Sequence, residues 1–158
     1  MAEYKIPPRI WMGELGWALI RGGLYAIGFM AVMVALGLVV SPWVILAVPA
    51  ALLLGFAFGA VGMAATSFMK TWQDFDLIQL VVLPMFLFSA TFYPLDAYPD
   101  ALRVIVQLTP LYQGVDLIRS LTVGVISPVL LFHVAYLAVM GVVGLVIASR
   151  RLDKLLLT

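Results

Sequence analysis

The chain has 158 residues, of which 65% are hydrophobic and 11% are charged, and its formal net charge is +1. A water-soluble domain of this size leaves about a third of its chain surface exposed, so it cannot cover so many apolar residues. The near-zero charge without a basic run excludes a nucleic-acid binder, and the lack of cysteine excludes a disulfide framework. The sequence therefore predicts one all-α integral membrane domain over residues 1–158.

The first two predicted spans share one long uncharged run. Residues 22–69 contain no Asp, Glu, Lys or Arg, and as a single helix they would be about 72 Å long against a bilayer core of about 30 Å. The run must therefore break, and Ser41-Pro42 is the break because the residue before a proline disfavours helix. Spans are predicted over 19–40 and 43–68, after a cytoplasmic lead-in at 1–15.

Two more uncharged runs predict the third and fourth spans, over 77–93 and 128–149. Four spans place both chain ends, including a tail at 150–158, on one side of the membrane. Seven of the nine Lys and Arg residues gather on that side: Lys5, Arg9, Arg21, Lys70, Arg150, Arg151 and Lys154. The positive-inside rule makes that side cytoplasmic, so both termini are predicted to be cytoplasmic.

Residues 94–127 are too apolar for a solvated loop. Thr109-Pro110 divides them into helical patterns over 99–108 and 110–125, with Thr109 suited to an N-cap and Pro110 to a first helical position. Both patterns are too short to span, and a span over the second would cost about 2.5–3.5 kcal/mol for each of its two charged residues. A re-entrant helical hairpin that dips into the outer leaflet, between the third and fourth spans, is therefore predicted.

Two charged pairs are candidate gate residues. Glu14 and Arg21 are seven residues apart and share one helix face at the cytoplasmic mouth of the first span, either as a pair that moves with a partner or as an ordinary interfacial anchor. Asp116 and Arg119, spaced i, i+3, are predicted to pair on one face of the outer hairpin. That pair is either self-neutralising or a gate towards the outer leaflet.

Three other features have a structural and a functional interpretation. The small residues Gly55, Gly59 and Gly62 let helices approach closely, within the bundle or at a dimer face. His133 is the only histidine and has no carboxylate near it in sequence, so a structural role is expected. The stretch containing Ile6, Pro7, Pro8, Arg9 and Trp11 is either a docking element for a soluble partner or a membrane-surface lead-in.

The sequence lacks the patterns of an enzyme. It has no Ser/His/Asp set, no HExxH motif and no glycine-rich phosphate loop. The uncharged span centres also argue against a proton-driven transporter and a selective channel. If the protein moves a substrate, another subunit supplies the energy, and no metal or other cofactor is expected in this chain.

Four segments together resemble the ABC-2-type permeases. Residues 83–95 read LPMFLFSATFYPL and resemble the family's LPxFLFSGTFFPL, and residues 108–119 read LTPLYQGVDLIR and resemble LTPLYHxVELxR. Residues 13–18 (GELGWA) resemble GELLWA, and residues 72–76 (WQDFD) resemble the end of SFEDFD. Ala90 stands where the family usually has glycine, and Gln113 stands where histidine is frequent. The chain is most similar to the branch with nodulation lipo-oligosaccharide and daunorubicin-type drug exporters.

The resemblance implies the C-terminal four-span portion of a six-span permease in a bacterial inner membrane. It implies that an amphipathic substrate (a lipid-linked sugar, a glycolipid or a drug) moves outward, driven by a separate ATPase subunit that binds ATP and Mg. By the same resemblance, residues contact the ATPase (Ile6, Pro7, Pro8, Arg9, Trp11), form a cytoplasmic gate (Glu14, Arg21) or lie near the exit (Tyr112, Asp116, Arg119).

The implied partners are the ATPase subunit, membrane lipid, and a second copy of the chain or another chain that supplies the two missing spans. The alternative is a truncated, non-transporting four-helix membrane protein that acts as an assembly or interaction partner. The two hypotheses differ in whether an ATPase binds the chain.

Overall fold

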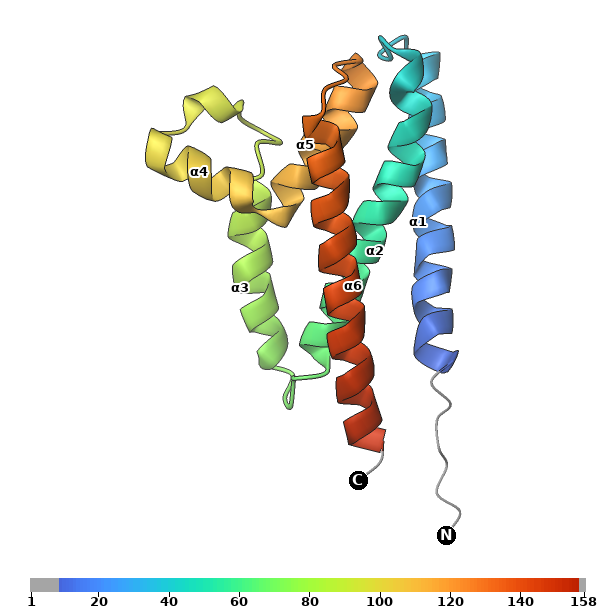
Figure 1. The fold of residues 1–158 in the computed structure, drawn as a ribbon, viewed down its shortest axis with the longest axis vertical. Helices are drawn as coiled ribbons and strands as arrows, with labels where there is room; N and C mark the ends of the chain where they lie inside the picture. Colours follow the sequence, from blue (N-terminus) through green and yellow to red (C-terminus); the bar gives the residue numbers. More distant parts are fainter. Residues whose placement is uncertain (1–8, 157–158) are drawn as a thin grey trace.

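The computed structural model describes residues 9–156, and every element in that range is helical. Three long helices lie side by side along the long axis, and a shorter helix crosses that axis (Figure 1). In chain order the elements are α1 (Arg9–Ala35), the 3-10 helix η1 (Pro42–Leu46), α2 (Ala47–Thr66), α3 (Asp74–Leu87), the 3-10 turn η2 (Leu95–Ala97), α4 (Asp100–Leu108), α5 (Pro110–Val123) and α6 (Val129–Leu156). The predicted all-α class is confirmed.

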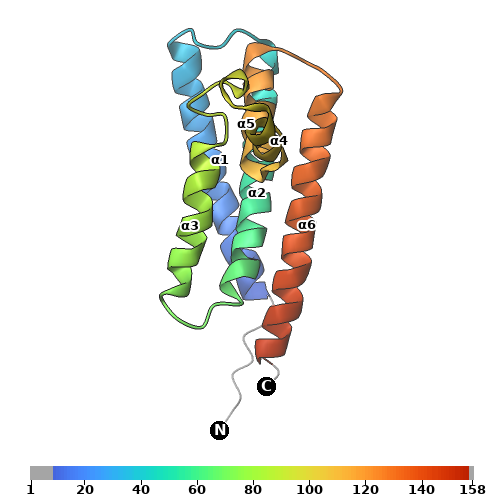
Figure 2. The ribbon, with the colours of Figure 1, turned by 90° about the vertical axis from the view of Figure 1, so that its left-hand side faces the viewer.

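Within residues 9–156, three segments are long and apolar enough to cross a membrane: Gly13–Ala35, Pro42–Thr66 and Val129–Arg151. They correspond to the first, second and fourth predicted spans. The start of α1 and the end of α6 lie at the same end of the bundle (Figures 1 and 2).

The third predicted span is shorter as a helix than expected. The 14 residues of α3 are about 21 Å long, less than the bilayer core of about 30 Å. The helix contains Pro84 and ends at Leu87, and the chain then turns through Ala90, which has a φ of +58°. The span predicted from the uncharged run, 77–93, therefore extends six residues past the end of the helix at Leu87. Hydropathy alone does not indicate where the backbone turns within an apolar run.

The link between α1 and α2 has the predicted break. The Ser41 hydroxyl accepts a hydrogen bond from the Trp43 amide at 3.3 Å, and Pro42 opens η1. The first helix ends at Ala35, five residues before the predicted end of its span, and Gly37 has a φ of +67°. A glycine in this left-handed conformation commonly ends a helix, which accounts for the difference.

The core lies where α2 and α6 cross closely. Two glycines of α6 allow this approach: a Cβ on Gly144 would lie 2.8 Å from the backbone nitrogen of Val61, and one on Gly141 would lie 2.4 Å from the Phe56 ring. Leu137 of α6 and Ala57 of α2 are fully buried beside them. Contact between backbones at small residues is a common way to hold membrane helices together.

The helical pair α4 and α5 follows the sequence prediction closely. The Thr109 hydroxyl accepts a hydrogen bond from the Tyr112 amide at 3.4 Å, and Pro110 is the first residue of α5. The helix ends at Gly124, whose φ of +89° suits glycine. Leu117 and Leu121 of α5 are buried in the core cluster that they share with α2 and α6.

Candidate functional site

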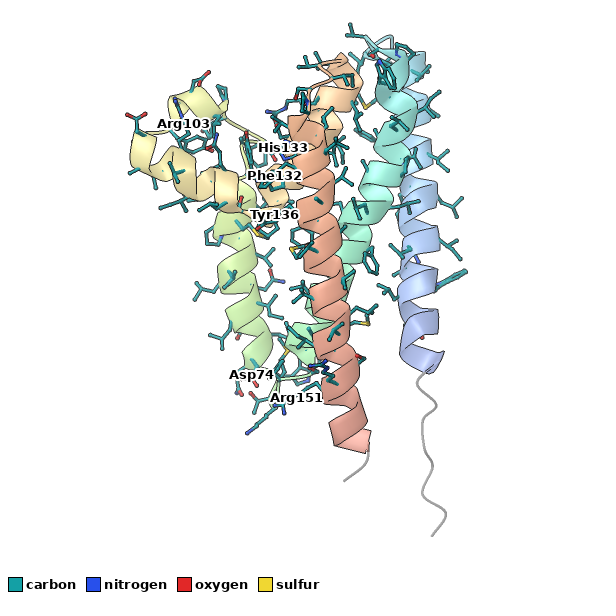
Figure 3. All side chains as sticks on the ribbon, in the orientation of Figure 1. Asp74, Arg103, Phe132, His133, Tyr136 and Arg151 are labelled. Atoms are coloured by element: carbon teal, nitrogen blue, oxygen red, sulfur yellow. The ribbon has the colours of Figure 1, made fainter. Side chains whose placement is uncertain are left out.

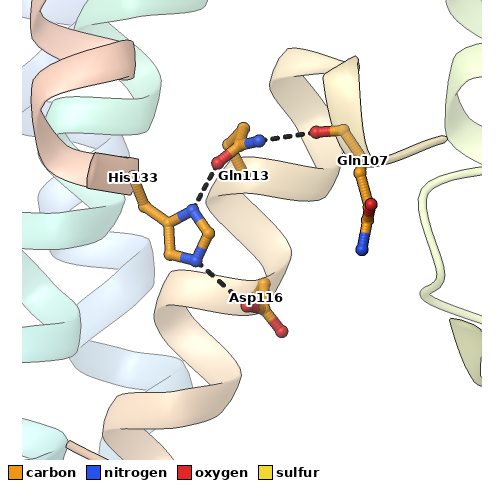
Figure 4. A network of polar contacts seen from close by, with 4 residues as sticks. All are labelled: Gln107, Gln113, Asp116 and His133. Carbon is orange, nitrogen blue, oxygen red and sulfur yellow. Dashed lines mark hydrogen bonds and ion pairs between the residues drawn. The ribbon is translucent and has the colours of Figure 1, made fainter. Parts of the chain in front are cut away.

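A buried polar network joins α5 to α6 near the end at which α6 begins. The His133 side chain is almost fully buried, and its Nε2 lies 3.0 Å from Oδ2 of Asp116. Its Nδ1 forms a hydrogen bond with Oε1 of Gln113. The Gln113 amide nitrogen in turn donates to the backbone carbonyl of Gln107, as Figure 4 shows. The network therefore reaches from α6, through α5, to the end of α4.

The same network satisfies the end of α4. The last carbonyls of a helix have no partner within it and need donors from elsewhere. The Gln107 carbonyl accepts from the Gln113 side chain, and the Leu108 carbonyl accepts from the Tyr136 hydroxyl of α6 at 2.9 Å. Side chains of α5 and α6 thus fix the sharp corner between α4 and α5 on the bundle.

Sequence reasoning missed the partners of His133. Along the sequence no carboxylate lies near His133, because Asp116 is 17 residues earlier, but in the folded chain the two side chains are in contact. The five-residue connection 124–128 folds α6 back along α5 and brings the two together. Gln113 and Asp116 are spaced i, i+3 and share one face of α5. This spacing could have indicated a polar contact with a neighbouring helix, but the sequence analysis did not use it.

The predicted pair of Asp116 and Arg119 is not formed, because each side chain has another partner. Asp116 faces His133, whereas the Arg119 guanidinium donates a hydrogen bond to the Ala90 carbonyl at 2.7 Å. Residues three apart on a helix diverge by about 60°, so one side chain turns towards α6 and the other towards the turn after α3. Tyr112 lies on the same helix and is half-buried.

The first helix carries the predicted cytoplasmic gate. Glu14 is exposed, and within the part of the chain that the structure describes it makes no ion pair with Arg21. The Arg21 guanidinium instead lies over the Trp17 ring, 5.7 Å from its centre. Arg21 is twelve residues, about 18 Å, past the first residue of α1, and its place at a cytoplasmic gate stays a prediction.

The predicted ATPase contact falls mostly outside the described residues. The structure does not describe three of its five residues, Ile6, Pro7 and Pro8. The other two, Arg9 and Trp11, belong to the first turn of α1.

Of the three glycines singled out in α2, Gly55 and Gly59 face α1, and a side chain on Gly62 would contact no other element. A Cβ on Gly59 would lie 2.9 Å from the end of the Leu15 side chain, one on Gly55 would meet Leu19 at an ordinary 3.5 Å, and one on Gly62 would meet nothing within 4 Å. The closest backbone contact instead uses the glycines of α6, which the sequence analysis did not single out. Their spacing, Gly141 followed three residues later by Gly144, places both on one helix face.

An apolar cleft of about 760 Å³ separates α3 from α2 and α6. Its walls include Phe58, Val81 and Met140, and Pro110 of α5 also lines it. No side chain of α3 is buried, so this helix borders the cleft without closing it. The cleft therefore offers an almost wholly apolar surface between helices.

One carboxylate lines the cleft, at the end of the bundle where α3 begins (Figure 3). The Asp74 carboxylate accepts hydrogen bonds from the backbone amides of Lys70 at 2.7 Å and Thr71 at 3.0 Å, which lowers the pKa of Asp74 below its usual 3.8. These bonds close the short link between α2 and α3. Nearby, the Arg151 guanidinium lies 4.4 Å from the centre of the Phe68 ring.

The residues that the structure describes contain no group of three or more His, Asp or Glu side chains placed to hold a metal ion. Their polar groups gather instead at helix ends and corners, while the helix sides are apolar. The three long apolar helices and the all-helical fold define a multi-pass helical membrane protein.

Residues 2–123 match the protein family described as "ABC-2 type transporter". The chain belongs to this family, whose members are membrane components of transporters and not enzymes. The resemblance drawn from the sequence motifs is therefore confirmed. Members of the family work with an ATP-binding subunit.

Three curated relatives show how much of a family member the chain represents. It is 30% identical over 149 residues to nodulation protein J of Rhizobium leguminosarum bv. viciae, covering 92% of this chain and 57% of that protein. The protein of the same name in Rhizobium meliloti is 32% identical, and the match covers 72% of this chain and 44% of that protein. The one in Sinorhizobium fredii is 28% identical, and the match covers 93% of this chain and 56% of that protein. The chain thus spans about half the length of these relatives, and it covers their C-terminal portion. No solved structure matches it significantly.

Proposed function

We propose that this chain is a membrane subunit of an ATP-driven exporter that moves an amphipathic substrate outward. A separate subunit binds ATP and Mg and hydrolyses the nucleotide. The observation that carries this proposal is membership of the ABC-2 transporter family over residues 2–123. The sequence resemblance names nodulation lipo-oligosaccharide exporters and daunorubicin-type drug exporters, and relatives named nodulation protein J favour the first of these. The proposed substrate is therefore a lipid-linked sugar or a glycolipid rather than a drug.

The cleft beside α3 supports an amphipathic substrate. Its apolar walls suit an acyl chain or another apolar group, and the exposed side of α3 leaves the cleft open to the lipid phase. A substrate whose apolar part slides along this surface needs no charged binding site in the membrane interior, where unpaired charges are costly.

The proposed topology has four membrane crossings, with both termini on the cytoplasmic side of a bacterial inner membrane. The helix α3, extended by the turn that follows it, makes the third crossing. Segment 94–127 is the re-entrant hairpin on the outer side. Its support is the course of the chain: α4 crosses the bundle axis, and α5 then packs back against both α2 and α6 (Figures 1 and 2).

The transporting unit contains more protein than this chain. Most apolar side chains of α1 are exposed, among them Phe29 at 69% and Tyr25 at 70%. Lipid or further helices cover such a surface in a membrane. A second copy of the chain, or a chain that supplies two further spans, completes the exporter, and the ATPase docks at the end that carries Arg9 and Trp11.

A reconstitution experiment tests this proposal. The chain and a candidate ATPase subunit are placed together in liposomes, and ATP hydrolysis and outward movement of a labelled glycolipid are measured. The expected result is hydrolysis stimulated by the chain and by the glycolipid. If the chain neither binds nor stimulates any candidate ATPase, it is the non-transporting membrane protein of the alternative hypothesis.

Two matched variants locate the substrate path. Val81→Trp fills the cleft from α3, and Leu80→Trp places the same bulk on the neighbouring exposed position, which does not line the cleft. Transport should fall at least tenfold in the first variant and stay close to wild type in the second. Equal transport in both would place the path elsewhere.

The gate is tested in the same liposomes. Replacing Glu14 with Gln or Arg21 with Met should leave ATP hydrolysis intact while transport falls, because each of these residues is proposed to transmit the movement of the ATPase. Normal transport per ATP in both variants would remove these residues from the mechanism.

A further inference from the structure

The apolar cleft beside α3 has the length of one membrane leaflet. On α3 its walls run from Asp74 to Met85, a distance of about 16 Å along the helix axis. One leaflet of the bilayer core is about 15 Å thick, half of about 30 Å. Because no side chain of α3 is buried, the cleft stays open along this length, and a lipid acyl chain can enter it sideways.

A polar hollow adjoins the cleft at the end where α3 begins. The hollow has a volume of about 330 Å³ and shares Met69 with the cleft as a wall residue. Its other walls come from the link between α2 and α3 and include Lys70, Thr71 and Trp72. The Trp72 side chain is exposed, and tryptophan is enriched where a membrane meets water. The apolar cleft thus leads into a polar hollow at the level of lipid headgroups, which is the profile that an amphipathic ligand requires.

Two groups of opposite charge lie at this end of the cleft (Figure 3). Asp74 lines the cleft itself, and the Arg151 guanidinium covers the ring of Phe68, another wall residue, at 4.4 Å. Among the side chains that the structure describes, neither Asp74 nor Arg151 makes an ion pair. Both amides of the link donate to Oδ2 of Asp74, which leaves Oδ1 available. Nε of Arg151 is buried and has no hydrogen-bond partner within the same described part of the chain.

We propose that the cleft binds one zwitterionic aminophospholipid, such as phosphatidylethanolamine, from the leaflet beside it. An acyl chain lies between α3 and the pair of α2 and α6, and the lipid phosphate accepts hydrogen bonds from Arg151. The primary ammonium of the headgroup donates to Oδ1 of Asp74. This occupant supplies an acceptor for the guanidinium and a cation for the carboxylate, whereas an anionic headgroup would set a second negative charge beside Asp74.

The other charged groups at this end fit the same ligand. Lys70 lines the polar hollow and is a second donor for the phosphate. Asp76 and Arg150 are exposed and line neither the cleft nor the hollow. The site requires only a membrane around the chain, so it does not rest on the proposed export function.

Lipid retention tests the headgroup contacts. The full-length chain is released from nanodiscs that hold phosphatidylethanolamine, phosphatidylcholine and phosphatidylglycerol in equal amounts with identical acyl chains, and the retained lipids are identified by native mass spectrometry. Phosphatidylcholine has no ammonium hydrogen to donate, and phosphatidylglycerol has no ammonium. Wild type should retain phosphatidylethanolamine about two- to fivefold over either of them, the range that an exposed ion pair supplies. Equal retention of the three lipids would overturn the proposal.

Matched substitutions assign the two contacts. Asp74→Asn should remove the preference for phosphatidylethanolamine, while the oxygen of the new amide still accepts from the link. Asp76→Asn removes an exposed carboxylate outside the cleft and should keep the preference. Arg151→Gln should lower the retention of all three lipids, and Arg150→Gln, at the neighbouring exposed position, should not. The same behaviour within either pair of variants would contradict the assigned contacts.

Added bulk in the cleft tests the place of the acyl chain. Val81→Trp fills the cleft, and Leu80→Trp puts the same bulk on an exposed neighbour outside it. Retention of phosphatidylethanolamine should fall at least threefold in the first variant and stay near wild type in the second, with helix content equal by circular dichroism. Equal retention in both would show that the lipid does not lie in the cleft. None of these measurements uses transport or an ATPase, so their failure is distinguishable from failure of the proposed export function.

Discussion

The contact between α2 and α6 gives the sharpest test of the fold, through the substitution Gly144→Ala. The added Cβ would lie 2.8 Å from the nitrogen of Val61 and 2.9 Å from the carbonyl carbon of Ala60. Both are backbone atoms of a helix and cannot rotate away. Ordinary contact begins near 3.4 Å, so the two helices must separate by about 0.6 Å, the difference between 3.4 and 2.8 Å.

Two opposing effects set the size of the change. Overpacking a close contact of this kind costs about 1–3 kcal/mol. Replacing glycine by alanine inside a helix contributes about 0.5–1 kcal/mol in the other direction. The net expectation is a loss of up to about 2.5 kcal/mol in the free energy of unfolding.

A matched substitution separates the two effects. Gly62→Ala is also in the interior of a long helix, but its new Cβ would meet nothing within 4 Å. It should therefore show the helix gain alone, a stabilisation of about 0.5–1 kcal/mol. The difference between the two variants isolates the helix contact and should be about 1–3 kcal/mol.

The assay is reversible unfolding of the chain in mixed micelles, in which the denaturing detergent is titrated and helix content is followed. Gly144→Ala should unfold at a lower detergent fraction than wild type, and Gly62→Ala at a higher one. Equal midpoints for the two variants would refute the argument that the backbones of α2 and α6 touch at Gly144.

Three further predictions concern the ends and turns of the helices. Ala90→Gly should raise the free energy of unfolding by up to about 1 kcal/mol in the same assay, because a φ of +58° strains a residue with a side chain. Tyr136→Phe should lower it by about 1 kcal/mol through loss of the bond to the Leu108 carbonyl. Because the pKa of Asp74 is lowered in the folded chain, its contribution is present above about pH 4 and is lost as the pH falls through that lowered value. Exchange of the link between α2 and α3 should therefore rise in acid, and Asp74→Asn should remove that acid dependence.

The elements with strong local signals were predictable from sequence. A proline after a capping hydroxyl restricts the backbone within two residues, so Ser41-Pro42 and Thr109-Pro110 marked helix starts correctly. The uncharged runs found the long helices, because a bilayer imposes the same length and polarity on each of them. No such constraint fixes a turn inside an apolar run, and the end of α3 was therefore missed.

The candidate site was less predictable, because it depends on helices that meet in space. His133 and Asp116 belong to different helices, and neither has a local pattern that indicates the other. The i, i+3 spacing of Asp116 and Arg119 predicted an ion pair that the structure replaces with two contacts to other elements. Helix spacing tells which side chains share a face, but it does not tell which neighbouring element lies closer to each of them.

The polar network of His133, Gln113 and Asp116 and the apolar cleft meet at the corner between α4 and α5. Pro110, the first residue of α5, lines the cleft. The carbonyls on the other side of that corner are held by Gln113 and Tyr136, and Gln113 is in turn held by His133. A movement of α5 away from α6 therefore displaces the residue that borders the cleft. Through this corner, the polar contacts of His133 help to hold in place a residue of the apolar surface that is proposed to carry the substrate.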